Sequence, residues 1–227
     1  MKTKRHSFNK GKDSYFYKKI QVNRTIEVCV ETFQEAEAAV KAGAMRIELC
    51  ADLFCGGTTP SLEIADRIIK ELKVPIMVMI RPRGGDFCYT QEEFKLMCNE
   101  LNLCHQYKID GVVFGILHHD KTIDIERTKE LVQLARPMQV TFHKAIDETP
   151  DLVQSVQELK DLGVERILSS GGKPTALEGK ENLLQMIERA GPELQIIVAG
   201  KVTWENLDTI SKTIPNKEYH GRRIVNF

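Results

Sequence analysis

The feature that most constrains the fold is a regular alternation of short β-branched runs with longer segments that have helical apolar spacing. Eight runs have the composition of buried strands: 26–30, 45–50, 75–81, 111–116, 139–143, 166–170, 195–199 and 218–221. Strands that alternate with helices pair in parallel, because a parallel connection needs a long crossover. The sequence therefore predicts an α/β fold of the (β/α)8 type, the TIM barrel, in which eight such units close on themselves.

Residues at the ends of the predicted helices support the same units. Thr32 is an N-cap type of residue ahead of a helical apolar pattern, and Gly43 and Gly163 stand where helices should end. An open, doubly wound sheet is the alternative arrangement. Its dinucleotide-binding form needs a GxGxxG sequence after the first strand, and this chain has none there, so the barrel is favoured.

The last predicted unit is short. Only residues 222–227 follow the eighth strand, which leaves no room for an eighth helix there. We therefore expect an incomplete or atypical last unit. Either the barrel is open at that point, or the gap is covered by the N-terminal residues or by a neighbouring subunit.

Charge divides the chain near residue 24. Residues 1–24 hold eight basic residues and one acidic residue, whereas the whole chain has 32 of each sign, so residues 25–227 are acidic overall. We expect a basic N-terminal extension over 1–24, solvated or disordered, and a barrel domain over 25–227. A basic tail is also able to reach nucleic acid or an anionic surface, but the acidic body predicts no nucleic-acid interface on the domain itself.

Composition also excludes several classes of protein. No stretch approaches the ~20 apolar residues of a membrane span, and the N-terminus lacks the apolar core of a secretory signal. The six cysteines include no CxxC pair in a chain of this length, which is typical of reduced thiols and not of a disulfide framework. We therefore expect a cytoplasmic protein without a membrane partner.

Polar residues gather at the C-terminal ends of the predicted strands, where the active sites of such barrels lie. The candidates are Glu27, Cys29, Arg46, Glu48, Cys50, Arg81, Arg83, His143, Lys144, Asp147, Ser170, Gly171, Lys201 and His220. Side chains alternate along a strand, so Glu27 and Cys29 share one face, and Glu48 and Cys50 share another. We expect these polar faces to point into the barrel.

Two of these residues are carboxylates, and a buried carboxylate must be paired or protonated. Arg46 or Arg81 is the expected partner of each of Glu27 and Glu48. The alternative is a set of internal salt bridges that only fills the barrel.

Cys29 and Cys50 fall at matching positions on adjacent predicted strands, which lie about 4.8 Å apart. Two inward thiolates there could bind a soft ion such as Cu(I). Cys55, in the loop after the second strand, could add a third sulfur. The alternative is that these cysteines are buried for packing alone, as cysteines often are.

Several loops after the strands have the composition of anion-binding sites. Arg81 and Arg83 precede a Gly-Gly pair, which suits a clamp of planar donors and accessible backbone amides. Further candidates follow strands six, seven and eight, near where barrel phosphate sites occur: Ser170, Gly171, Lys201 and His220. Ordinary tight turns are the alternative explanation of the glycine pairs.

His143 stands beside Lys144 and Asp147, and a histidine can act as general acid or base near neutral pH. Together with Glu48, these residues suit catalysis without a metal. The polar set thus also fits a metal-independent barrel enzyme that acts on a small anionic or phosphorylated metabolite.

Several segments together resemble the CutC family, in order from about residue 26 to 222: EVCV, RIELCADL, GGTTPS, PIMVMIRPRGGDFCY, DGVVFGIL, VTFHKAID, RILSSGG, ALEG and EYHGRR. The resemblance implies a cytoplasmic TIM-barrel protein of copper homeostasis, commonly a homodimer or homotetramer. It also implies Cu(I) binding by Cys29 in EVCV and Cys50 in IELC. The family usually has arginine where this chain has Lys144, which offers an anion only a point charge. It also usually continues past HGRR with another helix.

Three hypotheses follow. The first is a copper homeostasis protein that binds Cu(I) through paired cysteines. The second is the metal-independent enzyme, which would explain the many buried charges that a copper carrier does not need. The third is a degenerate member of the family, given its short last unit.

Overall fold

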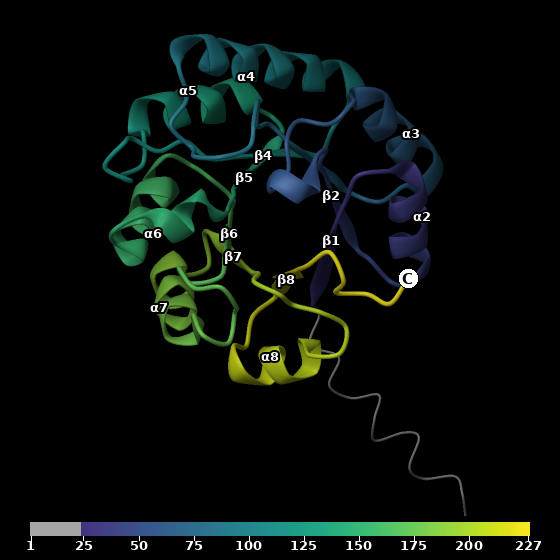
Figure 1. Cartoon of the computed structure of the whole chain (residues 1–227), viewed down its shortest axis with the longest axis vertical. Helices are drawn as coiled ribbons and strands as arrows, with labels where there is room; N and C mark the ends of the chain where they lie inside the picture. The colour runs from purple at the N-terminus through teal and green to yellow at the C-terminus, as the bar shows by residue number, and fades with distance from the viewer. Residues whose placement is uncertain (1–23) are drawn as a thin grey trace, which may run out of the picture.

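Eight parallel strands close into a barrel, which confirms the predicted fold (Figure 1). The structure, a computed structural model, describes residues 24–227. The strands are β1 (Thr25–Val30), β2 (Arg46–Leu49), β3 (Ile76–Met79), β4 (Gly111–Phe114), β5 (Gln139–Phe142), β6 (Arg166–Ser169), β7 (Gln195–Val198) and β8 (Glu218–His220). Each strand pairs with the next one in the chain, and β8 pairs with β1.

A ring of helices covers the outside of the barrel (Figure 1). The α-helices between the strands are α2 (Phe33–Lys41), α3 (Leu62–Leu72), α4 (Gln91–Cys104), α5 (Ile125–Ala135), α6 (Leu152–Asp161), α7 (Lys180–Ala190) and α8 (Leu207–Thr213). Short 3-10 helices lie in three of the connections: η1 (Leu53–Cys55), η2 (His105–Tyr107) and η3 (Lys144–Glu148). The predicted N-cap of α2 is confirmed, because the Thr32 side chain accepts from the Glu35 amide in a capping box.

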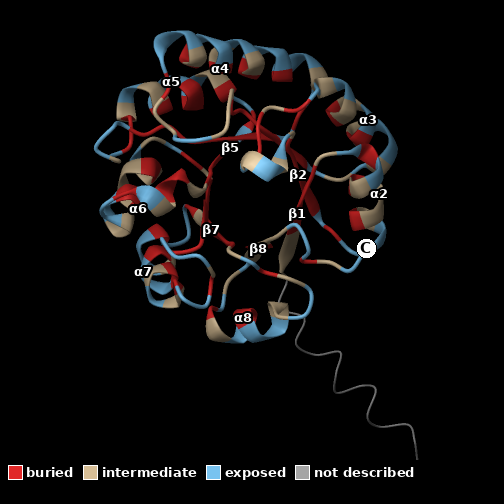
Figure 2. Ribbon diagram, viewed as in Figure 1, coloured by how far each residue is buried: buried red, intermediate tan, exposed pale blue. Residues whose placement is uncertain are grey.

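The apolar core fills the layer between the strands and the helices. Buried residues follow the strands and the inward faces of the helices, while the outward faces are exposed (Figure 2). The helices use apolar spacing of period 3.6 to present one buried stripe to the sheet, as α6 does with Val156 and Leu159. None of the helices in residues 24–227 is long and apolar enough to cross a membrane.

The barrel is closed at its last unit, which excludes the alternative of an opening there. Glu27 of β1 registers with His220 of β8, and no helix follows β8 in the described part of the chain. Instead, the C-terminal segment turns back along the rim, where the Trp204 amide donates to the Arg223 carbonyl at 2.8 Å. The chain then ends beside α2 (Figure 1). The predicted extension 1–24 lies, except for Arg24, outside the described residues.

Candidate functional site

A cavity of about 140 Å³ opens at the C-terminal ends of the strands. Seven side chains that line it carry titratable groups: Cys29, Glu48, Cys50, Arg81, His143, Lys144 and His220. All seven are among the residues that the sequence singled out. Four other candidates that were expected at an anion site, namely Arg83, Ser170, Gly171 and Lys201, do not line this cavity.

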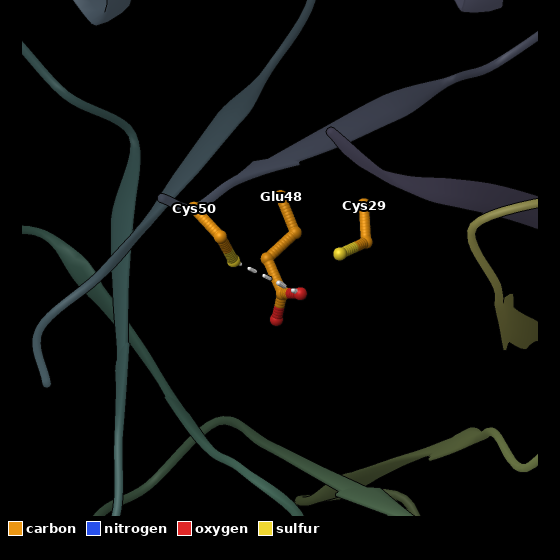
Figure 3. Close-up of side chains that lie close together, drawn as sticks. All are labelled: Cys29, Glu48 and Cys50. Carbon is orange, nitrogen blue, oxygen red and sulfur yellow. Dashed lines mark hydrogen bonds between the residues drawn. The ribbon is translucent and has the colours of Figure 1, made fainter. Parts of the chain in front are cut away.

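Cys29, Glu48 and Cys50 form a compact group inside the barrel (Figure 3). The sulfur of each cysteine and a carboxylate oxygen of Glu48 all lie within 4.8 Å of one another. The predicted matching of the two cysteines is wrong, because Cys29 registers with Glu48 and Cys50 follows the end of β2. Glu48 therefore lies between the cysteines, and the Cys50 thiol donates to its Oε2 at 3.7 Å (Figure 3).

The surroundings of this group favour a negative charge on one of its two sulfurs. A hydrogen bond with Cys50 and the nearby His220 lower the pKa of Cys29 to about 5 in spite of its burial. The same interaction with Cys29, together with burial, raises the pKa of Cys50 well above its usual value. Burial also raises the pKa of Glu48 to about 8. These shifts favour a negative charge on Cys29 and a proton on Cys50.

A second network of charges lies below this group, where β1 meets β8. The Oε1 of Glu27 lies 2.8 Å from Nδ1 of His220, and Arg46 forms ion pairs with both Glu27 and Glu218. Burial alone would raise the pKa of Glu27, but the charges and hydrogen bonds of Arg46 and His220 lower it to about 2. The predicted pairing of Glu27 with Arg46 is confirmed.

Glu48 has a different partner from the one that we expected. Its Oε2 lies 3.7 Å from Nε2 of His220, and its Oε1 is buried without a hydrogen-bond partner in the described residues. Burial opposes the charged form of His220, but the adjacent Glu48, Cys29 and Glu27 raise the pKa of this imidazole well above its usual value. The positive charge of His220 therefore faces the Cys29 thiolate and the Glu48 carboxyl group.

Arg81 binds backbone and does not pair with Glu48. Its guanidinium donates to the carbonyl oxygens of Cys55 at 3.3 Å, Gly57 at 2.9 Å and Gly85 at 2.8 Å. These contacts join the loops that follow β2 and β3. Cys55 itself lies outside the metal-ligand group, because its thiol donates to the Asp52 carbonyl at 3.1 Å.

His143 does not form the predicted set with Asp147. Its Nδ1 accepts from the Ala145 amide at 3.2 Å, and its Nε2 is buried without a partner among residues 24–227. Burial, together with the charge of Arg81, lowers the pKa of His143 to about 3. The ring is therefore neutral at physiological pH. The acid–base interpretation required a histidine that titrates near pH 7, and His143 does not meet that requirement.

Asp147 fills the glycine-rich cradle that we expected to hold an external anion. Its carboxylate accepts from Ser169 Oγ at 2.5 Å, from the Ser170 amide at 3.0 Å and from the Gly172 amide at 2.9 Å. Lys144 adds an ion pair to Asp147 at 3.0 Å and donates to Ser170 Oγ at 2.5 Å. These donors stabilise a carboxylate of the protein itself, so the cradle is not free for a phosphate.

Two further candidates for the anion site, Arg83 and Lys201, lie away from the cavity. Arg83 pairs with Glu93 at 2.6 Å and with Asp86 at 3.0 Å, which takes its guanidinium away from the predicted clamp with Arg81. Lys201 is exposed, in a left-handed turn (φ 54°) after β7. Arg83 therefore takes nearby acidic partners, whereas Lys201 points to solvent.

Glu218 and Phe87 are among the residues of the site that were missed from the sequence. Glu218 completes the ion pairs of Arg46, and its position two residues before His220 places both side chains on one face of β8. Phe87 packs against His143 at 4.8 Å between ring centroids and lies 4.9 Å from the Arg81 guanidinium carbon. Alternation along the strand could have identified Glu218, whereas Phe87 lies in an irregular loop.

Most of this chain matches one known protein family. The model of the CutC family matches residues 24–225, which is nearly the whole described chain. This chain belongs to the CutC family. A mouse member, named copper homeostasis protein cutC homolog, is 41% identical over 86% of this chain and 72% of its own length. A CutC protein of Treponema denticola is 40% identical over 87% of this chain and 80% of its own.

A solved structure of the CutC family shows the same barrel. The CutC protein of Streptococcus agalactiae superposes with a TM-score of 0.85 at 32% identity, and the match covers 89% of this chain and all of that one. The (β/α)8 fold of this CutC family member therefore agrees with that of a crystallised relative. Copper homeostasis is part of the names of the mouse and Streptococcus agalactiae relatives.

Proposed function

We propose that this CutC family member serves copper homeostasis by binding Cu(I) through Cys29 and Cys50. The observation that carries the proposal is the placement of both sulfurs and the Glu48 carboxylate within 4.8 Å of one another. Neither cysteine is in a disulfide, so both sulfurs are available as ligands.

The chemistry of the donors favours a soft ion. Thiolate and thioether ligands select Cu(I), and the thioether of Met79 lines the same cavity as the two thiols. Cys29, Cys50 and Met79 also belong to one small apolar cluster inside the barrel, which limits access of water to a bound ion.

The charges around the thiols are also suited to a monovalent ion. The Cys29 thiolate is present before the ion arrives, so only Cys50 has to release its proton when Cu(I) binds. Two thiolates and one Cu(I) carry one net negative charge, and the protonated His220 offsets it. Glu48 remains protonated and is placed to donate a hydrogen bond to sulfur.

Competition with a colourimetric Cu(I) chelator under anaerobic conditions tests the proposal. We expect tight binding of one Cu(I) by the full chain and its loss in Cys29→Ser/Cys50→Ser. Cys55→Ser is the matched control, because that sulfur lies in the adjacent loop and binds a backbone carbonyl. Binding that is weak in the wild type, or equal in the double variant, would remove copper from the function.

A further inference from the structure

Arg81 is a buried positive charge that no acidic side chain balances. Only 4% of the residue is exposed, and its three hydrogen bonds go to backbone carbonyls. Within residues 24–227, Arg81 forms no ion pair, unlike Arg46 and Arg83, which both bind carboxylates. A buried charge without a counter-charge is costly, so this position favours an anion from outside the chain.

His143 adds a buried donor that has nothing to bind. Its Nδ1 accepts from the Ala145 amide, so the proton of the neutral imidazole is on Nε2. That Nε2 has no partner in the described chain, although the residue is only 4% exposed. A buried N–H group without an acceptor loses the hydrogen bond that it makes in water, and a ligand oxygen would restore it.

The imidazole is also held in one orientation. Phe87 packs on one side, and Gly115 leaves the room that the ring needs, since a Cβ at residue 115 would lie 2.6 Å from Cε1 of His143. A donor that is fixed in this way loses little entropy when a ligand binds.

Lys144 completes the positive wall of the cavity. Its ammonium group lies 3.0 Å from Asp147, and its side chain is 43% exposed at the mouth. It lines the same cavity as Arg81 and His143. Burial and, after it, the charge of Arg81 lower the pKa of His143, which places the Arg81 guanidinium near the imidazole.

The size of the cavity and the kinds of donors that line it restrict the chemical class of ligand that it can hold. Pockets for drug-sized ligands measure about 300–1,000 Å³, and this cavity measures about 140 Å³, which suits a molecule of a few carbon atoms. A phosphate group usually binds to clustered backbone amides. Here the amides of Ser170 and Gly172 are taken by Asp147, and Arg83 is taken by Glu93.

We propose that the cavity binds a small carboxylic acid, whose carboxylate accepts from His143 Nε2 and lies between Arg81 and Lys144. Its carbon chain then extends toward Cys29, Glu48 and Cys50 at the opposite wall. This makes the barrel a receptor or enzyme for a small organic acid as well as a candidate copper site. The carboxylate site does not depend on copper, because none of its three basic residues is a proposed copper ligand.

Calorimetric titration of the copper-free full chain tests this site. The probes are acetate, glycolate, lactate, pyruvate and malonate, with inorganic phosphate and phosphoglycolate for comparison. We expect saturable binding of at least one carboxylate and weaker binding of both phosphates. The affinity for that carboxylate should fall at least tenfold in His143→Phe and in Lys144→Met, and stay unchanged in Lys201→Met.

Lys144→Met keeps the test decisive if His143→Phe fails to fold, because Lys144 is half exposed. The proposal would be overturned if no carboxylate binds, or if the wild type and Lys144→Met bind it equally well. Tighter binding of the phosphates would overturn the assignment of the ligand as a carboxylate. Cys29→Ser/Cys50→Ser separates the two proposals, since it should lose Cu(I) and retain the carboxylate. If the wild type does not bind Cu(I), the copper proposal fails, and the carboxylate result still stands.

Discussion

Glu27 and His220 face each other across the seam that closes the barrel, with Glu27 Oε1 2.8 Å from His220 Nδ1. The other oxygen of Glu27 binds Arg46, so one carboxylate joins three consecutive elements of the ring, β8, β1 and β2. Because its Nδ1 is fixed, His220 presents Nε2 to Glu48, at 3.7 Å. The charges that close the barrel therefore also orient the imidazole above the thiols.

Removal of Arg46 should show how much the fold depends on this seam. Arg46→Leu leaves the carboxylate of Glu27, which is 2% exposed, buried beside a hydrophobic side chain. We expect a loss of about 3–5 kcal/mol in the free energy of unfolding, as is usual when one partner of a buried pair is removed. Lys70→Ala breaks an exposed pair with Asp66 and should cost less than about 1 kcal/mol. Similar losses in both variants, measured by denaturant unfolding, would refute a structural role of the seam.

Glu48→Gln should stabilise the protein at neutral and higher pH. The pKa of Glu48 is raised from 4.5 to about 8, so the folded protein keeps this proton while the unfolded chain releases it above pH 4.5. The group therefore costs stability that grows as the pH rises from 4.5 to 8. At pH 7 we expect the variant to be more stable by roughly 2–4 kcal/mol, since one pKa unit corresponds to about 1.4 kcal/mol. At pH 4 the difference should vanish. A difference that does not change with pH would show that Glu48 is ionised in the folded protein.

His143→Gln should make the protein less sensitive to acid. The pKa of His143 falls from 6.5 to about 3 in the folded state, so only the unfolded chain takes up this proton as the pH drops below 6.5. The stability from the neutral ring is complete above pH 6.5 and is lost toward pH 3, at about 1.4 kcal/mol per pH unit. Unfolding curves between pH 6.5 and 4.5 should show the wild type losing stability relative to the variant at that rate. His118→Gln, at an exposed loop position, is the control.

Asp147→Asn tests whether this carboxylate is structural. An amide group cannot accept from Ser169, Ser170 and Gly172 on both of its terminal atoms, and it also loses the ion pair with Lys144. We expect a loss of about 1–3 kcal/mol in the free energy of unfolding. Cu(I) affinity should stay unchanged, because Asp147 does not line the cavity. A variant of unchanged stability would contradict the structural assignment.

The fold and the titratable residues of the β1 and β2 part of the cavity could be predicted from the sequence, because both depend on periodic patterns. Alternation along β1 and β2 placed Glu27 and Cys29, and Glu48 and Cys50, inside the barrel, and the structure confirms this. Their register could not be predicted. Strands in a closed barrel are staggered, and this stagger places Cys29 opposite Glu48 and not opposite Cys50.

The partners of the long side chains could not be predicted either, because they depend on the shape of the loops. Arg81 takes three carbonyls and Arg83 takes Glu93, although both follow the same strand. Asp147 binds the amides after β6 and not His143, again because the shape of the loops decides which groups it can reach. The cytoplasmic location, the homo-oligomeric state and the role of residues 1–24 stay predictions.

X-ray absorption spectroscopy of the Cu(I)-loaded chain tests the copper site most directly, because it reports the atoms bound to the metal. We predict two sulfur ligands from cysteine in the wild type, and the loss of one of them in Cys50→Ser. The Cys55→Ser spectrum should match that of the wild type. A first shell without sulfur, or a spectrum that is the same in Cys29→Ser/Cys50→Ser, would contradict the assignment of Cys29 and Cys50 as the copper ligands.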